Sequence, residues 1–193
     1  MLPGGTSFAP VFAPDGQSLA LSVTVNGNTD LYAVNGDGSG LRRLTTSPAI
    51  DTEPAFSPDG SQIVFSSDRS GSQQLYVMRA DGTGQRRISF GPGECGSPAW
   101  SADSKKIAFT NINGGSMRIG IMDVDGSDLK FLTAGPYDSQ PTWGPSGDHV
   151  MFQRKAVATG HTSLLIMPID GSQPRPVSTP QDGSDPSWIA REQ

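Results

Sequence analysis

The sequence is poor in the residue types that build most catalytic and metal sites. Among its 193 residues it has one cysteine, Cys95, and two histidines, His149 and His161. A single thiol excludes a disulfide within the chain and leaves the redox compartment open. The histidines follow no metal-ligand spacing, and there is no Gly-x-Ser-x-Gly nucleophile motif. We therefore expect surface roles for both histidines, no enzymatic activity, and no cofactor or metal.

Long apolar runs and helical periodicity are also missing. No run reaches the roughly 18 apolar residues that suggest a membrane span. The first residues have neither the charged start nor the apolar centre of a secretory signal. No segment of eleven residues repeats its apolar side chains at helical spacing. The sequence thus predicts an all-β chain without an export signal of its own.

Excess positive charge is absent as well. Fourteen basic and nineteen acidic side chains give a formal net charge of −5. No basic stripe is interleaved with aromatic residues, so a phosphate backbone would find little to hold it. We do not expect nucleic acid as a partner.

What the sequence does contain is glycine and proline at regular positions. It has 24 glycines and 16 prolines. Five prolines, here called the repeat prolines, open similar segments at spacings of 44, 44, 43 and 45 residues: Pro10, Pro54, Pro98, Pro141 and Pro186. A period in the forties with strand and turn signals inside it is typical of a β-propeller made of four-stranded blades.

Each repeat contains four segments of strand length. In the second repeat they span 53–56, 62–66, 74–79 and 85–89. The second and third segments are apolar at consecutive positions, which predicts burial on both faces. An Asp-Gly turn precedes each fourth segment, because glycine accepts the positive φ of a tight hairpin. Calcium is the alternative for such turns, notably at Asp123, Asp125 and Ser127, but the closing glutamate of an EF-hand is missing.

The repeats predict a single, partial propeller domain over 1–193. Its blades span 7–45, 51–89, 95–133 and 138–178, and an unpaired innermost strand follows at 184–189. Four blades and one extra strand cannot close the ring in the usual way, which pairs the last strand with three strands from the chain start. We expect the C-terminal part of a larger propeller, or a ring completed by a second copy of the chain.

The residues just ahead of the repeat prolines vary while the scaffold residues recur. In a propeller these residues lead into the innermost strands and line one mouth of the central channel, and loops on a rigid scaffold often carry recognition. They could instead be solvated loop tips with no partner. The sequence predicts a partner-binding surface made of Thr6, Phe8, Thr52, Glu53, Ser97, Asp138, Gln140 and Asp185.

Several segments resemble the TolB family of the Tol-Pal system. They are Asp-Thr-Glu-Pro-Ala-Phe-Ser-Pro-Asp-Gly at 51–60, Phe-Ser-Ser-Asp-Arg-Ser-Gly at 65–71, Leu-Tyr-Val-Met at 75–78 and Arg-Arg-Ile-Ser at 86–89. Similar repeats occur in peptidase propellers and in other bacterial proteins. Members of the family have a signal peptide, an N-terminal α/β domain and a six-bladed propeller, of which this sequence matches the last four blades and the closing strand.

The resemblance implies a periplasmic, non-catalytic interaction scaffold in envelope integrity and cell division. Its implied partner is Pal, the peptidoglycan-associated lipoprotein, bound over the propeller mouth. The family's Thr-Glu before the proline corresponds to Thr52 and Glu53, and the Glu53 carboxylate would accept hydrogen bonds from Pal. The contact that the family makes with TolA lies in the N-terminal domain. Two alternatives remain: a propeller separated from a hydrolase or lyase, and a truncated propeller without a retained function.

Overall fold

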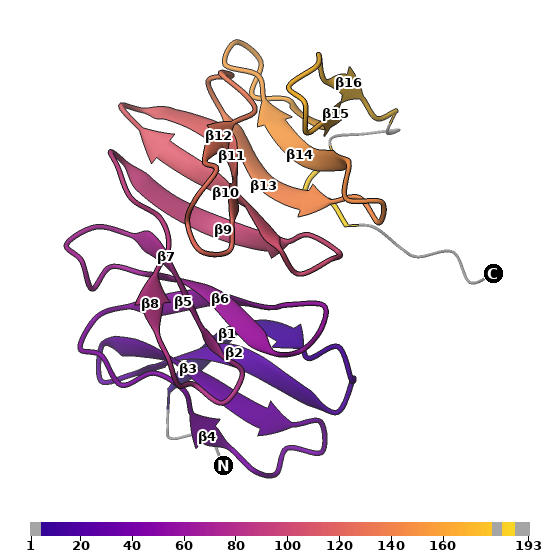
Figure 1. Cartoon of the computed structure of the whole chain (residues 1–193). Helices are drawn as coiled ribbons and strands as arrows, with labels where there is room; N and C mark the ends of the chain where they lie inside the picture. The colour runs from indigo at the N-terminus through magenta and orange to yellow at the C-terminus, as the bar shows by residue number, and fades with distance from the viewer. Residues whose placement is uncertain (1–4, 179–182, 188–193) are drawn as a thin grey trace. The chain divides into compact units, whose positions relative to one another are not determined.

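The chain folds as four antiparallel sheets in two compact units. The computed structural model describes residues 5–178 and 183–187. The first unit is Met1–Gly91 and the second is Pro92–Gln193, and each contains two four-stranded sheets (Figure 1). The described residues form no helix, and hence none long and apolar enough to cross a membrane. The predicted all-β fold of four four-stranded blades is confirmed.

Every sheet follows chain order, so each blade is a meander of consecutive strands. The strands of the first unit are β1 (Thr6–Phe12), β2 (Ser18–Val25), β3 (Asn28–Asn35), β4 (Arg42–Arg43), β5 (Asp51–Phe56), β6 (Gln62–Ser67), β7 (Gln74–Arg79) and β8 (Arg86–Arg87). Those of the second unit are β9 (Glu94–Trp100), β10 (Lys106–Asn113), β11 (Ser116–Asp123), β12 (Lys130–Phe131), β13 (Asp138–Trp143), β14 (His149–Lys155), β15 (Thr162–Pro168) and β16 (Arg175–Pro176).

The core of the first unit lies between its two sheets. Strands β2 and β3 contribute Ala20 and Leu31, which pack with Ile63 and Phe65 of β6 and with Tyr76 of β7. Both Ile63 and Phe65 are completely buried. In the second blade the consecutive apolar positions of the second and third strands are therefore buried on both faces, as predicted.

The second unit has a matching core between its two sheets. Ile119 and Ile121 of β11 pack with Val150, Phe152 and Trp143 of the last blade. Within the third blade, the ring of Phe109 lies against Gly120, where an added Cβ would be 2.6 Å from a ring atom. A glycine in this otherwise apolar strand thus makes room for the large side chain on the neighbouring strand.

The outer strands are shorter than predicted, for a reason that recurs in three blades. In the second blade the ladder of β8 covers only Arg86 and Arg87, and then the backbone N–H of Leu75 donates to the Ser89 hydroxyl at 2.8 Å. Thr45 and Thr133 accept in the same way from Leu31 and Ile119, both at 3.0 Å. The side-chain oxygen replaces a backbone carbonyl as the acceptor, so the regular ladder ends at Arg87, although Ile88 still donates its backbone N–H to the Leu75 carbonyl at 2.9 Å.

The Asp-Gly turns have the predicted conformation. Gly38, Gly82, Gly126 and Gly171 all have positive φ, between 83° and 93°. The aspartate of each turn accepts a hydrogen bond from the backbone N–H two residues later, as in the 2.8 Å bond from Ser127 to Asp125. The Ser127 hydroxyl also donates to this carboxylate oxygen, at 2.6 Å. The carboxylates therefore close their own turns.

One face of the first blade is more exposed than the equivalent face of the second. Phe12 of β1 is 64% exposed, whereas its counterpart Phe56 packs against the core. Leu19 is half-buried, but its counterpart Ile63 is fully buried. The equivalent face of the second blade is covered by the first blade, so the first blade presents a sheet face without a neighbouring sheet inside its unit.

The innermost strand expected at 184–189 lies partly outside the described residues. Residues 183–187 carry no assigned strand, although Asp185 has the same positive φ, 50°, as the residues before the other repeat prolines. The Gly183 N–H donates to the Thr162 carbonyl at 3.1 Å. The fifth innermost strand therefore stays a prediction.

Candidate binding surface

The predicted site residues lie where each innermost strand begins, at a bulge that the sequence analysis missed. Every residue before a repeat proline has a positive φ of 49–53°, and every inner strand shifts its pairing register there. These residues are Ala9, Glu53, Ser97, Gln140 and Asp185. Proline cannot donate to a ladder, and a bulge re-aims the side chain next to it. The recurring proline inside an apparent strand was the signal for this bulge.

In the first unit Glu53 lies at the bulge of β5. Glu53 and Thr52 are half-buried, and the Ser66 hydroxyl donates to the Glu53 carboxylate at 2.8 Å. On the adjoining β1, Thr6 and Phe8 are exposed. Because β1 lies against β5, these four predicted residues belong to one region of the first unit.

The start of β5 is fixed by an ion pair directly before Thr52. The carboxylate of Asp51 is fully buried, and both of its oxygens lie 2.9 Å from one guanidinium nitrogen of Arg69. Another Arg69 nitrogen donates to Gln85 at 2.7 Å. The guanidinium also lies over the Tyr76 ring, 4.8 Å from its centre. The ion pair therefore links the entry of β5 to the loop after β6 and to the outer strand.

The second unit repeats this arrangement with Asp138 and Arg154. The Asp138 carboxylate is fully buried and accepts from Arg154 Nε at 2.6 Å and from a terminal nitrogen at 2.8 Å. The hydrogen bond to Asp138 raises the pKa of the Arg154 guanidinium, and burial opposes this shift only partly. The Asp138 carboxylate is therefore engaged inside the blade. Neither ion pair was anticipated, although an aspartate three residues before the proline, followed by an arginine, occurs in both repeats.

The other predicted residues of the second unit have varied surroundings. Ser97 is half-buried at the β9 bulge, and Asp185 is exposed, with a 3.0 Å hydrogen bond from Ser184. The backbone N–H of Gln140 donates to the Thr110 hydroxyl at 3.1 Å. The Gln140 side-chain oxygen is buried and accepts no hydrogen bond within the described part of the chain. That the residues of the two units line a single mouth stays a prediction.

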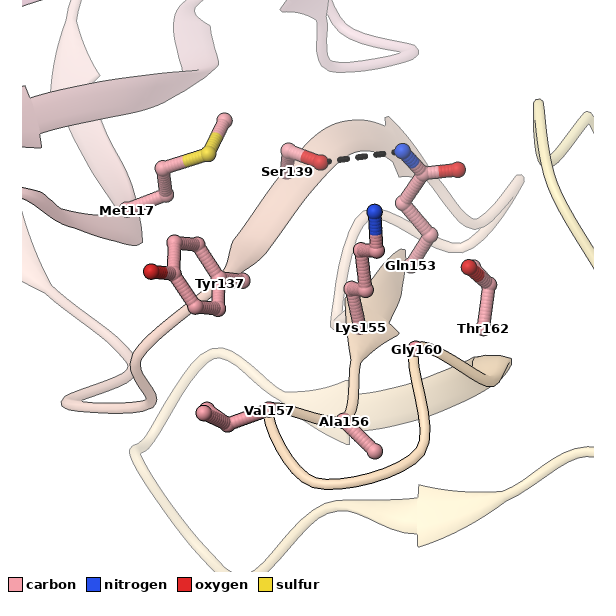
Figure 2. A pocket seen from close by; sticks show the side chains of 9 residues that line it. All are labelled: Met117, Tyr137, Ser139, Gln153, Lys155, Ala156, Val157, Gly160 and Thr162. Carbon is pink, nitrogen blue, oxygen red and sulfur yellow. Dashed lines mark hydrogen bonds between the residues drawn. The ribbon is translucent and has the colours of Figure 1, made fainter.

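A cavity of about 580 Å³ opens beside Ser139, at the end of the last blade where β13 begins (Figure 2). Its walls come from β11, the start of β13, the end of β14 and the loop that follows. The lining residues are Met117, Tyr137, Ser139, Gln153, Lys155, Ala156, Val157, Gly160 and Thr162. The sequence analysis did not find it, because its walls derive from segments up to 45 positions apart in the chain.

The histidines and the cysteine have ordinary surroundings. His149 is half-buried and its Nδ1 lies 2.8 Å from Asp148, while His161 lies in the exposed loop between β14 and β15. Cys95 is buried, and Asn111 contacts its sulfur at 3.5 Å. Across residues 5–178 and 183–187, no three His, Cys, Asp or Glu side chains gather as metal ligands would.

The fold defines the class of protein: a β-propeller domain built of four-stranded antiparallel blades. A puromycin-hydrolyzing peptidase from Mycobacterium tuberculosis has the same fold with 16% identity and a TM-score of 0.70, over 89% of this chain and 28% of the other. At that identity the likeness extends to the fold alone.

The family model described as TolB beta propeller domain matches residues 3–191, so the chain belongs to that family. The crystal structure of TolB from Acinetobacter baumannii is similar, with 30% identity and a TM-score of 0.79; the match covers 90% of this chain and 43% of the other. The Tol-Pal system protein TolB of Rhizorhabdus wittichii is 54% identical over 51 residues, which are 26% of this chain and 12% of that protein. The predicted family is confirmed, and the chain spans less than half the length of these relatives.

Proposed function

We propose that this chain is a non-catalytic binding module that acts in the periplasm within a Tol-Pal system. Its proposed partner is a Pal-like peptidoglycan-associated lipoprotein, bound at the bulge of the first unit by Thr52 and Glu53. The observation that carries the proposal is the half-buried Glu53 carboxylate, which the Ser66 hydroxyl holds at the bulge of β5, the strand that packs against β1 with its exposed Thr6 and Phe8. Charge-assisted hydrogen bonds to such a carboxylate are among the stronger contacts an interface can make.

The Asp51–Arg69 ion pair supports this proposal because it holds the strand entry in place. A surface that is already ordered loses little conformational entropy when a partner binds. Ser97 and Gln140 occupy the equivalent bulges of the second unit, and Asp185 has the same positive φ. We propose that these three residues extend the contact with the same partner. Asp138 serves that surface through its ion pair with Arg154.

Capture by purified Pal tests the proposal. We expect Glu53→Lys to weaken capture at least tenfold, because it replaces a negatively charged acceptor with a positively charged donor, while the melting temperature stays within a few degrees. The matched control is Asp37→Lys, the same charge change in an exposed turn at the opposite end of a blade in the same unit. Undiminished capture by a folded Glu53→Lys variant would show that Glu53 is not part of the interface.

We also propose that a second copy of the chain covers the exposed face of the first blade. The equivalent face of the second blade is covered by a sheet, through Ile63, Phe65 and Tyr76. On the first blade the corresponding positions include the exposed Phe12 and the half-buried Leu19 and Tyr32. A sheet built from the same repeat has the shape to fill this face, and another copy supplies such a sheet.

A further inference from the structure

The cavity beside Ser139 has a charge character that points to an anionic ligand. Its lining includes Lys155 and no aspartate or glutamate. The neighbouring Arg154 is neutralised by Asp138, whereas Lys155 forms no ion pair with any carboxylate among the described residues. His161 lies in the loop that follows β14. An unneutralised ammonium group at the wall of a concave site attracts anions.

Hydroxyl groups add hydrogen-bond donors on the same wall of the cavity as Lys155. The amide of Gln153 donates to the Ser139 hydroxyl at 3.0 Å, so the Ser139 proton is available for another acceptor. In Figure 2 the Lys155 ammonium points toward this hydrogen bond. Thr162 lies on the other side of Lys155 from Ser139. Ammonium and hydroxyl groups that converge in this way suit the two oxygens of a carboxylate.

The opposite wall is apolar. Met117, Tyr137 and Val157 lie together on the other side of the cavity in Figure 2. Val157 is 69% exposed and Tyr137 is 38% exposed, so a ligand that covers them removes apolar surface from water. Because the two walls differ, a ligand that fits both carries an apolar group next to its negative charge.

The walls are held in place before any ligand arrives. The Met117 N–H donates to the Pro136 carbonyl at 2.9 Å, and the Lys155 N–H donates to the Tyr137 carbonyl at 3.0 Å. Met117 and Tyr137 also form a parallel β-bridge between the two blades of the second unit. The volume, about 580 Å³, falls within the range of roughly 300–1,000 Å³ that small-ligand sites occupy.

We propose that this cavity binds a peptide residue that presents a carboxylate beside an apolar side chain. Lys155 is the counter-ion, Ser139 and Thr162 donate to the carboxylate, and Met117, Tyr137 and Val157 receive the apolar side chain. The carboxylate can come from the C-terminus of a peptide or from an internal aspartate or glutamate. The site lies in the second unit and does not depend on the contact proposed at Glu53.

Three short peptides separate these sources. The first ends in leucine with a free carboxylate, the second is its C-terminal amide, and the third has an internal Asp-Leu pair and an amidated end. Amide chemical-shift titration of the whole chain reports both the affinity and the place of binding. We expect shifts confined to the cavity, around Val157 and Thr162, and an affinity that falls as salt is raised.

The peptides that bind identify the source of the carboxylate. Binding of the first peptide alone assigns the site to a C-terminus, and binding of the third assigns it to an acidic side chain. Lys155→Ala should weaken either interaction about tenfold, and Lys155→Arg should restore most of it because the charge returns. Lys130→Ala, on the exposed strand β12 of the same unit, is the matched control.

The proposal is overturned if the amide binds as well as the charged peptides, or if Lys155→Ala binds them like the native chain. It is equally overturned if no peptide shifts the cavity residues. Lys155 is exposed at the end of β14, so these variants should keep the fold, and circular dichroism checks this. Glu53→Lys should leave peptide binding unchanged, so failure of this site is distinguishable from failure of Pal capture.

Discussion

Replacing Arg69 with alanine should destabilise the first unit far more than the removal of any exposed charge. The change leaves the Asp51 carboxylate, which is completely buried, without its guanidinium partner. Removing one member of a buried ion pair costs about 3–5 kcal/mol. The Arg69 side chain is 21% exposed, so water that enters its place offsets part of this cost. We expect a loss of about 3 kcal/mol.

Such a loss is large against the total stability of a domain, which is about 5–15 kcal/mol. With a urea dependence of about 2 kcal/mol per molar, the unfolding midpoint of the first unit should fall by about 1.5 M. Urea unfolding followed by the backbone amide NMR signals of Tyr76 and Tyr32 reports on this unit, because both tyrosines belong to it. Arg69→Met, which keeps an unbranched apolar side chain, should lose nearly as much if the charge and not the packing is responsible.

The control is Lys130→Ala, which removes a surface ion pair with Asp128 in which both side chains are about half exposed. Exposed pairs contribute less than about 1 kcal/mol. A double-mutant cycle with Asp51→Asn completes the test, because the two changes should be clearly non-additive. Additive losses, or an Arg69→Ala loss no larger than that of Lys130→Ala, would refute the role given to this ion pair.

Two further predictions concern association and pH. Phe12→Asp should convert a self-associated chain to a monomer in light scattering after size exclusion, because Phe12 is 64% exposed on the uncovered sheet face; a native chain that is already monomeric at high concentration would contradict the second-copy contact. The pKa of Asp59 is lowered below its usual value, first by the hydrogen bond from the Ser57 hydroxyl and then by those from Ser61. A lowered folded-state pKa stabilises the fold above the unfolded pKa of about 3.9, and this stabilisation disappears as the pH falls through the folded value. The melting temperature of Asp59→Asn should therefore lie below that of the native chain at pH 7, and the gap should close as the pH falls below the unfolded pKa; a gap independent of pH would exclude a contribution from ionisation.

The blades could be predicted because their signals are local and repeated. A Pro-Asp-Gly turn, a run such as Ile63-Val64-Phe65 and an Asp-Gly turn each specify a neighbouring strand or hairpin from a few adjacent residues. With four copies in the chain, a weak signal in one copy is supported by the others. The strand lengths were less well predicted, since the hydroxyls of Ser89 and Thr45 end the outer ladders by bonding residues 14 positions away.

The positions before the repeat prolines could be singled out from the sequence, but their backbone geometry could not. Variation between repeats identified Glu53 and Gln140, yet the positive φ of these residues depends on the register shift with the next strand. The burial of Asp138 depends on Arg154, whose distance from it is set by the length of a hairpin. The cavity could not be predicted from the sequence, because Met117 and Lys155 come together only when two blades pack.

The blades also show how variable strand entries are kept rigid. The second and fourth blades use an ion pair at the position three residues before the proline, Asp51 with Arg69 and Asp138 with Arg154. The third blade has Cys95 there, and Asn111 takes over by donating to the Glu94 carbonyl at 3.2 Å while it accepts from Arg118 at 3.0 Å.

Different side-chain interactions thus fix the same backbone position in the second, third and fourth blades. Because rigidity comes from the position before the bulge, the bulge residue itself is free to differ from blade to blade without loss of the fold. That separation explains how one repeat can keep its scaffold and still present Glu53, Ser97 and Gln140 at equivalent places. It also predicts that substitutions at the bulge change binding, whereas substitutions at the fixed position change stability first.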